Sequence, residues 1–265
     1  MGKLGNLPGL KYLIAPIISL LLVIAGVIVF IPSIKPKSNP SALEQGRAYI
    51  KSEESRDVSG IDKTLRMRVS EEALEGMDIW EKLDYFDTYI MGDSRVGLFI
   101  WSGMNPDHVW AEASTTIKYI EENIDLIAAA KPENLVLSFG MNDLGMYEFN
   151  PDDYWETAQD YVEAYKYYID MIRSVSPETN IYINCIIPAL EAGIERQPRW
   201  ALAPEWNEAL KEFCAQNDVS FIDVSYIADV YADYFEDDGV HFYWQAALDD
   251  WGESIVEAIE EKEFS

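Results

Sequence analysis

A fully buried strand is indicated by the run NLVLSF at residues 134–139, which leads directly into Gly140-Met141-Asn142-Asp143. A strand of a parallel sheet is covered on both faces, so it reads as a nearly continuous apolar run rather than as an alternating one. The run IYINCII at residues 181–187 has the same character, and a long stretch of helical periodicity separates the two runs. Strands that alternate with helices are typical of a parallel sheet between two helical layers.

Working outward from these runs, the same reading predicts five strands and four long helices. The strands are expected at residues 87–91, 109–113, 134–139, 181–187 and 220–224, and the helices at 114–130, 151–175, 204–217 and 243–261. We therefore predict an α/β fold, a three-layer α/β/α sandwich of flavodoxin-like type with a five-stranded parallel sheet, over residues 86–265.

The first 37 residues have a different composition and are predicted to anchor the chain in a membrane. Residues 13–31 contain no charge, and as a helix their length approaches the ~30 Å hydrocarbon thickness of a bilayer. The following PSIKPKSNP has no convincing A-x-A cleavage site, so we expect an uncleaved transmembrane helix in region 1–37, with a cleaved signal peptide as the alternative. The positive charge of the amino terminus favours an orientation with the N-terminus inside the cell. The expected location is the cell membrane, with residues 38–265 outside.

Residues 38–85 are predicted to form a polar stalk that contains one helix. Ser70, followed by Glu71 and Glu72, is a signal for the beginning of a helix, and an apolar stripe runs from Leu74 to Leu83. The expected role of this segment is spacing or packing.

Composition and charge limit the classes of partner. The chain is 49% apolar and 25% charged, which is typical of a globular protein, and its formal net charge is -27. All 47 acidic residues but only 16 of the 20 basic residues lie in 38–265, so nucleic acid is excluded as a partner and neutral or cationic ligands are favoured. No group of residues has the spacing of a zinc or calcium site, and we expect neither a metal nor a cofactor.

Reactive side chains follow two of the expected strands and precede the last expected helix. In open parallel sheets, ligands bind beyond the carboxyl ends of the strands. Ser94, in Met91-Gly92-Asp93-Ser94-Arg95, is the candidate nucleophile, and it needs a base. His241 is one of two histidines in the chain, and Asp238 lies three residues before it, where a turn can bring the carboxylate to Nδ1. The other histidine, His108, is read as structural or exposed.

Asn142 is the candidate donor to a developing oxyanion, because an amide NH₂ after the third strand can reach a carbonyl that Ser94 attacks. The alternative is a turn or helix-capping residue. The Ser94 backbone N–H, near the beginning of a helix, is a second candidate donor.

The three motifs, in this order, resemble those of the SGNH hydrolase superfamily, also called GDSL-like esterases and lipases, across residues 86–261. The resemblance implies a catalytic triad of Ser94, Asp238 and His241. It also implies a third oxyanion donor, the N–H of a glycine after the second strand. Here that loop reads AEASTT at residues 111–116, so Ser114 stands as the candidate in place of the glycine, with Ala113 beside it and Gly103 less well placed.

The form GDSR resembles membrane-anchored or secreted members of Gram-positive bacteria that act on acylated cell-surface carbohydrates. We therefore expect a serine esterase that hydrolyses O-acyl esters, above all O-acetyl esters, on an extracellular carbohydrate or a small ester. Two alternatives stay open, an acyltransferase onto a cell-surface glycan with the same triad, and an inactive membrane-tethered binding or scaffolding protein.

Several further residues are open to more than one interpretation. Residues 189–204 are the longest expected loop and the segment expected to shape the pocket; in it, Arg196 and Arg199 are candidates for reading an anionic group or are simply solvated. The thiols of Cys185 and Cys214 read as small buried groups, with a disulfide left open. Five tryptophans are candidates either for stacking on sugars or for the core, namely Trp101, Trp110, Trp200, Trp206 and Trp244.

Overall fold

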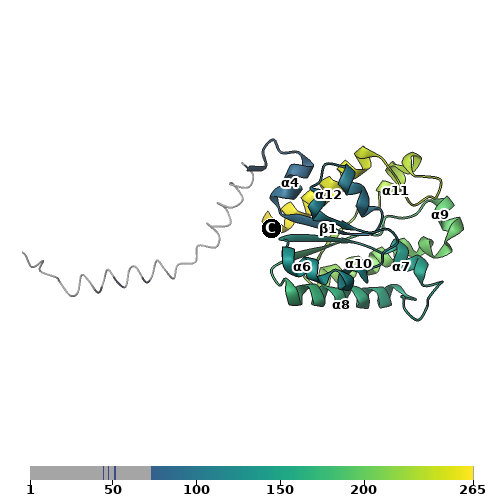
Figure 1. Ribbon diagram of the computed structural model, residues 1–265, viewed down its shortest axis with the longest axis horizontal. Helices are drawn as coiled ribbons and strands as arrows, with labels where there is room; N and C mark the ends of the chain where they lie inside the picture. Colours follow the sequence, from purple (N-terminus) through teal and green to yellow (C-terminus); the bar gives the residue numbers. More distant parts are fainter. Residues whose placement is uncertain (1–43, 45–46, 48–50, 52–72, 265) are drawn as a thin grey trace, which may run out of the picture. The chain divides into compact units, whose positions relative to one another are not determined.

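The computed structural model describes Glu44, Arg47, Lys51 and residues 73–264 (Figure 1). The predicted anchor (1–37), with its apolar stretch at 13–31, and most of the predicted stalk lie outside these residues. Within the described residues, no helix combines the length and the hydrophobicity that crossing a bilayer requires.

Five parallel strands form one sheet in the order β2-β1-β3-β4-β5. The prediction of an α/β fold with a five-stranded parallel sheet is confirmed. The chain moves from β1 outward to β2 and then returns to β3 on the other side of β1, so the connections diverge at the carboxyl ends of β1 and β3, where α/β sheets place their ligands. The strands are β1 (Thr88–Gly92), β2 (Val109–Ala111), β3 (Asn134–Ser138), β4 (Asn180–Asn184) and β5 (Ser220–Ile222).

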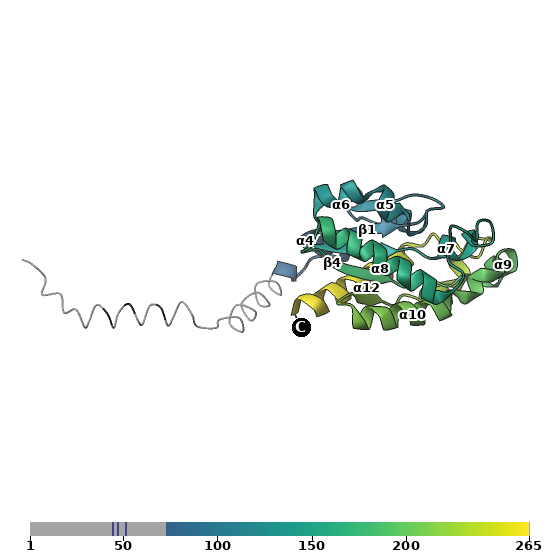
Figure 2. The same cartoon turned by 90° about the horizontal axis from the view of Figure 1, so that it is seen from below.

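Helices cover both faces of the sheet (Figures 1 and 2). One face carries α5 (Tyr119–Glu122), α6 (Ile124–Ala130), α8 (Ala158–Val175) and α10 (Ala203–Gln216), and the other carries α4 (Ile79–Tyr85), α11 (Ile227–Val230) and α12 (Gln245–Phe264). Short 3-10 helices span Val96–Trp101, Pro106–His108, Pro198–Leu202 and Ala232–Tyr234.

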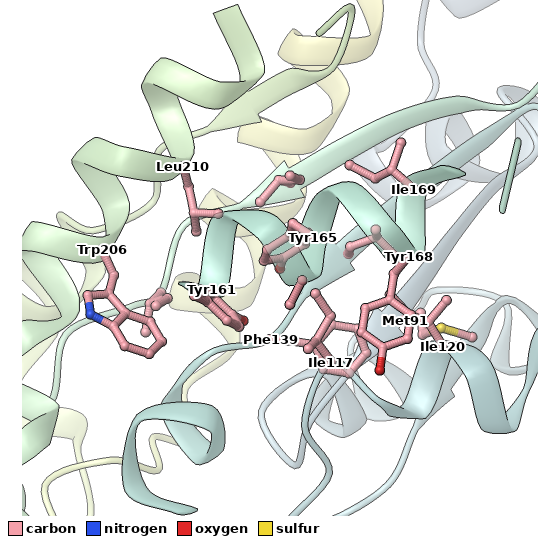
Figure 3. Packing of buried hydrophobic residues seen from close by; sticks show 14 of the residues in the cluster. Met91, Ile117, Ile120, Phe139, Tyr161, Tyr165, Tyr168, Ile169, Trp206 and Leu210 are labelled. Carbon is pink, nitrogen blue, oxygen red and sulfur yellow. The ribbon is translucent and has the colours of Figure 1, made fainter. Parts of the chain in front are cut away.

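Two apolar clusters, one on each side of the sheet, form the core. Side chains alternate along a strand, so Leu135 and Leu137 of β3 point into one cluster and Val136 into the other. The first cluster is rich in aromatic rings, with Tyr161 packed between Tyr165 and Trp206 (Figure 3). All six side chains are fully or almost fully buried, and this core holds the strand ends in place.

The apolar stripe at 74–83 does not form the single helix that was expected. Ala73 and Leu74 are helical, but the chain then turns at Gly76, whose φ of +85° favours glycine. A new helix, α4, begins after Asp78, whose carboxylate accepts a hydrogen bond from the Glu81 N–H while the Glu81 carboxylate accepts one from the Asp78 N–H. The expected start at Ser70 lies outside the described residues.

Other expected elements differ mainly at their beginnings. The helix expected from residue 114 begins only with α5 at Tyr119, and the one expected from 151 begins at Ala158, after Thr157 forms a capping box with Asp160. Residues 189–204 are not one open loop, because α9 (Glu191–Arg196) and the 3-10 helix Pro198–Leu202 occupy most of them.

Candidate active site

Ser94 lies on a tight turn directly after β1. The turn is compact because Gly92 packs against the carbonyl of Ser138 in β3, where a Cβ would overlap the backbone. The buried Asp93 carboxylate accepts a hydrogen bond from the Arg95 N–H at 3.0 Å and forms an ion pair with the Arg95 guanidinium at 3.6 Å. Arg95 also donates to the carbonyl of Ile187 at 2.8 Å, which ties the turn to the segment after β4. The Ser94 hydroxyl therefore has a well-supported position.

The structure brings Ser94, His241 and Asp238 into one hydrogen-bonded chain. The Ser94 Oγ lies 2.8 Å from the His241 Nε2, and the His241 Nδ1 lies 2.6 Å from the Asp238 Oδ2. The other carboxylate oxygen, Oδ1, accepts hydrogen bonds from the backbone N–H groups of Val240 at 2.8 Å and His241 at 2.9 Å. A carboxylate on Nδ1 places the ring proton there, so Nε2 is left to accept a proton from the serine.

The same contacts set the charge of Asp238. Burial alone raises the pKa of the Asp238 carboxyl, but hydrogen bonds from the His241 ring and from the backbone N–H groups of His241 and Val240 outweigh it, so the pKa is lowered. The residue stays a carboxylate in neutral and mildly acidic solution and stabilises an imidazolium beside it.

The loop that carries Asp238 and His241 is held on two sides. A bridge between Phe235 and Phe242 closes it, and the Glu236 N–H donates to the His241 carbonyl at 2.7 Å. On the other side it packs against α9, because Gly193 of that helix approaches Gly239 so closely that a Cβ at Gly239 would meet the Gly193 nitrogen at 2.5 Å. Close packing of backbone on backbone leaves the catalytic loop little freedom.

Asn142 lies in α7 (Met141–Met146), which begins after a two-residue connection from β3. Gly140 precedes it with a φ of +131°, a conformation that glycine adopts readily. The Asn142 Nδ2 donates to the carbonyl of Thr115 at 2.9 Å, which fixes the amide orientation and leaves one amide hydrogen for another acceptor.

The residue after Asn142, Asp143, is fully buried and was not singled out by its own chemistry in the sequence. Its carboxyl accepts a hydrogen bond from the Ile117 N–H at 3.1 Å and so ties α7 to the loop that contains Thr115. Burial raises the pKa of Asp143 to about 7, although the bond from Ile117 lowers it.

A cavity of about 100 Å³ opens beside these groups, and it contains four of the five predicted site residues. The residues that line it are Asp93, Ser94, Arg95, Met141, Asn142, Arg196, Trp200, Asp238, Val240 and His241. The fifth candidate, Ser114, is exposed and is not among the lining residues. Its φ of +64° is nevertheless one that favours glycine, which fits the place where the resemblance implies a glycine. Gly103 packs against the ring of Trp80 and does not line this cavity either.

Comparison with known proteins assigns the chain to a family. Residues 103–245, just over half of the chain, match the sequence model of the GDSL-like Lipase/Acylhydrolase family. The chain belongs to this family. The resemblance to GDSL-like (SGNH) hydrolases and the expected enzyme class, a hydrolase that acts on ester bonds, are thereby confirmed. A search of curated proteins found no match.

Two solved structures of other proteins share the fold. The lipase/acylhydrolase from Enterococcus faecalis is 18% identical, with a TM-score of 0.51 over 66% of this chain and 95% of that chain. A protein from Parabacteroides merdae assigned as a GDSL-like lipase is 15% identical, with a TM-score of 0.53 over 64% of this chain and 94% of that chain. At these identities the similarity shows the fold alone.

Of the other residues predicted for this GDSL-like hydrolase, some line the cavity and others stabilise the fold. Arg196 and Trp200 line the cavity, as expected of the 189–204 segment. Arg199 does not: it donates to the carbonyls of Leu144, Trp155 and Glu156 and so holds the neighbouring segments together.

Of the other tryptophans, Trp206 is a core residue, Trp110 is half-buried against Tyr89, and Trp101 and Trp244 are exposed. His108 stacks on Tyr89 at 4.0 Å, away from the cavity, which agrees with the structural interpretation.

Cys185 and Cys214 are buried free thiols, not a disulfide, and burial raises the pKa of each to about 12. Over residues 73–264 and the three isolated described positions, no cluster of side chains suits a metal ion.

Sequence reasoning missed the supports of the GDSL-like site rather than its reacting groups. The bond from Arg95 to the Ile187 carbonyl and the contact of Gly193 with Gly239 join parts of the chain that lie far apart in sequence, so no local pattern reports them. The one available signal was the adjacency of Asp93 and Arg95 to Ser94.

Proposed function

We propose that this protein is a serine esterase that removes short acyl groups, above all acetyl groups, from a carbohydrate outside the cell. The observation that carries the proposal is the unbroken chain of hydrogen bonds from Ser94 through His241 to Asp238, at the edge of a small cavity. The same observation favours an active enzyme over a tethered binding protein, because a fold kept only for binding has no need of a serine on the accepting nitrogen of an oriented imidazole.

Hydrolysis in this site proceeds in two steps. The His241 Nε2 takes the proton of the Ser94 hydroxyl as its Oγ attacks the ester carbonyl, and the imidazolium is stabilised by the Asp238 carboxylate. The same imidazolium then gives the proton to the departing alcohol, which leaves an acyl group on Ser94. Water, activated by His241 in the same way, releases the acid and restores the serine.

The oxyanion of each tetrahedral intermediate is held by N–H donors at the beginning of the helical segments. The free hydrogen of the Asn142 amide is one donor, since the other already binds the Thr115 carbonyl. The Ser94 N–H is the second, because the turn uses the neighbouring amides of Asp93 and Arg95 and no acceptor among the described residues takes that of Ser94. One such donor contributes about 3 to 4 kcal/mol to transition-state stability. Ser114 stands as a third candidate from the loop that Asn142 contacts.

The size of the cavity supports a short acyl group. Its volume of about 100 Å³ is smaller than the ~150 Å³ that suits a benzene ring and far below the ~300 Å³ at which pockets for drug-sized ligands begin. A group of a few heavy atoms, such as acetyl, fits this space, whereas a lipid chain needs a longer apolar channel. The GDSL-like family includes lipases, so the cavity volume favours short-chain esters over lipids among the substrates considered for a member of this family.

The proposed location rests on the sequence. The uncharged stretch at residues 13–31 would hold the enzyme in the cell membrane of a Gram-positive bacterium, with the catalytic region outside, where acylated cell-surface glycans occur. Expression of the full chain and of a chain lacking residues 1–37 tests this, because only the full chain should sediment with membranes.

The catalytic proposal is tested by labelling and turnover. A fluorophosphonate probe should label the wild-type protein and a Ser174→Ala control, which alters an exposed serine of α8, but not Ser94→Ala. Turnover of 4-nitrophenyl acetate should fall by several orders of magnitude in Ser94→Ala with an unchanged circular dichroism spectrum. Labelling of Ser94→Ala to the wild-type level would refute the proposal. Acetyl transfer to added oligosaccharide, in excess of release into water, would favour the acyltransferase alternative.

A further inference from the structure

The cavity beside Ser94 is close to neutral, although the chain carries a net charge of -27. Two aspartates and two arginines line it, together with His241. Three of the four charges have partners, since Asp93 pairs with Arg95 and Asp238 binds His241. The fourth charge is the guanidinium of Arg196, and among the described residues no carboxylate lies within ion-pair distance of it.

The guanidinium of Arg196 is held at the cavity wall by a hydrogen bond that uses only part of its donor capacity. Arg196 is the last residue of α9, and its Nη2 donates to the backbone carbonyl of Asp237 at 2.8 Å. A guanidinium has five N–H donors, so most of them are left for a ligand. Arg199, three residues later, differs from Arg196 in that its guanidinium is engaged within the protein. It donates to three carbonyls and lies over the ring of Tyr147, 4.3 Å from the ring centre.

We propose that Arg196 binds an anionic oxygen group, a carboxylate or a phosphate, that the substrate carries near its scissile ester. The inference rests on the proposed function and names the class of substrate more closely. A guanidinium presents its N–H donors in a planar fork that matches both kinds of oxyanion. The acidic surface repels anions over longer distances, but at physiological salt this repulsion is largely screened beyond about 8 Å, whereas the contact with Arg196 is not.

The test compares matched esters, one anionic and one neutral in each pair. The carboxylate pair is the acetyl ester of lactate and that of lactamide, and the phosphate pair is 2-acetoxyethyl phosphate and 2-acetoxyethyl methyl ether. We expect Arg196→Gln to lower kcat/KM for one or both anionic esters by about 10-fold, mainly through KM, and to leave the neutral esters unchanged. The pair that responds identifies the anion. Arg196→Lys should recover part of the loss, since it keeps the charge but not the fork.

Lys166→Gln, an exposed change on α8 with the same effect on net charge, is the control and should alter neither series. An anionic-to-neutral ratio that Arg196→Gln leaves unchanged overturns the inference. An equal loss on charged and neutral esters also overturns it, because Arg196 would then only position the Asp238 loop through the Asp237 carbonyl. A wild-type protein that hydrolyses none of the four esters refutes the proposed function as well as the inference. The two outcomes above refute the inference alone, so the two failures can be told apart.

Discussion

Replacing Asp238 by asparagine tests the proposed mechanism most directly, because the structure dictates how the new amide must lie. The Asp238 Oδ1 accepts two backbone N–H groups, from Val240 and His241, and these donors tolerate only an oxygen. The amide NH₂ of Asp238→Asn must therefore occupy the position of Oδ2, which lies 2.6 Å from the His241 Nδ1. An NH₂ there requires Nδ1 to accept, so the ring proton moves to Nε2 and faces the Ser94 hydroxyl.

The expected loss follows from that tautomer. An Nε2 that carries a proton cannot take one from Ser94, and in a serine protease triad the corresponding change lowers kcat by about 10⁴. We expect a fall of the same order, roughly 5 kcal/mol in activation free energy, measured as kcat on 4-nitrophenyl acetate near pH 7.5. The backbone bonds of the loop survive, so the melting temperature should change by only a few degrees.

Asp237→Asn is the matched control, because its side chain is exposed and one position away, and it should keep full activity. If Asp238→Asn retained more than a tenth of wild-type kcat while folded, the carboxylate would not set the tautomer and the mechanism would be wrong.

Three further changes probe the supports of the site. Gly193→Ala should lower kcat roughly 10-fold on every ester, because its Cβ would press on the carbonyls of Asp238 and Gly239 at 3.1 Å and shift the catalytic loop; unchanged kcat would show that the loop adapts. Asp143→Asn should remove a loss of stability with rising pH: the folded pKa of about 7 lies above the ordinary 3.8, so the contribution of Asp143 to stability is greatest below about pH 4 and falls, by up to roughly 4 kcal/mol, as the pH rises to about 7. Urea titrations at pH 5 and 8 measure this, and an equal pH dependence in the variant would contradict it. Trp200→Ala should raise the butyrate-to-acetate ratio of kcat/KM by opening the cavity wall beside Met141, and a constant ratio would place the acyl group elsewhere.

Buried strands and their adjoining loops were predictable because both depend on short stretches of chain. Leu135 to Leu137 read as buried on both faces, and in the structure they are. Ser94, Asn142, Asp238 and His241 follow strands or precede a helix, and the rule for parallel sheets then places them at one edge. The structure brings these four side chains to one cavity.

Helix beginnings and the supports of the site were not predictable in the same way. Backbone conformation decides the break at Gly76, and capping decides the late start of α8 at Ala158. The free energy of such a turn or cap is close to that of a continued helix, so the sequence does not show which one forms. α9 was read as loop because a six-residue helix is too short for a periodic pattern, and its role appears only once Gly193 meets Gly239. The case for Ser114 as a third oxyanion donor stays a prediction, and its glycine-like backbone conformation is visible only in the structure.

Ser94 and His241, the proposed nucleophile and base, are 147 positions apart, and this separation has a consequence for the timing of activity in the cell. A ribosome that adds roughly 5 to 20 residues per second needs about 7 to 30 seconds to proceed from one to the other. Until then the emerging chain carries an ordinary, unreactive hydroxyl. A nascent polypeptide is thus harmless to any ester it meets, and hydrolytic power arises only when its final segment has emerged and docked.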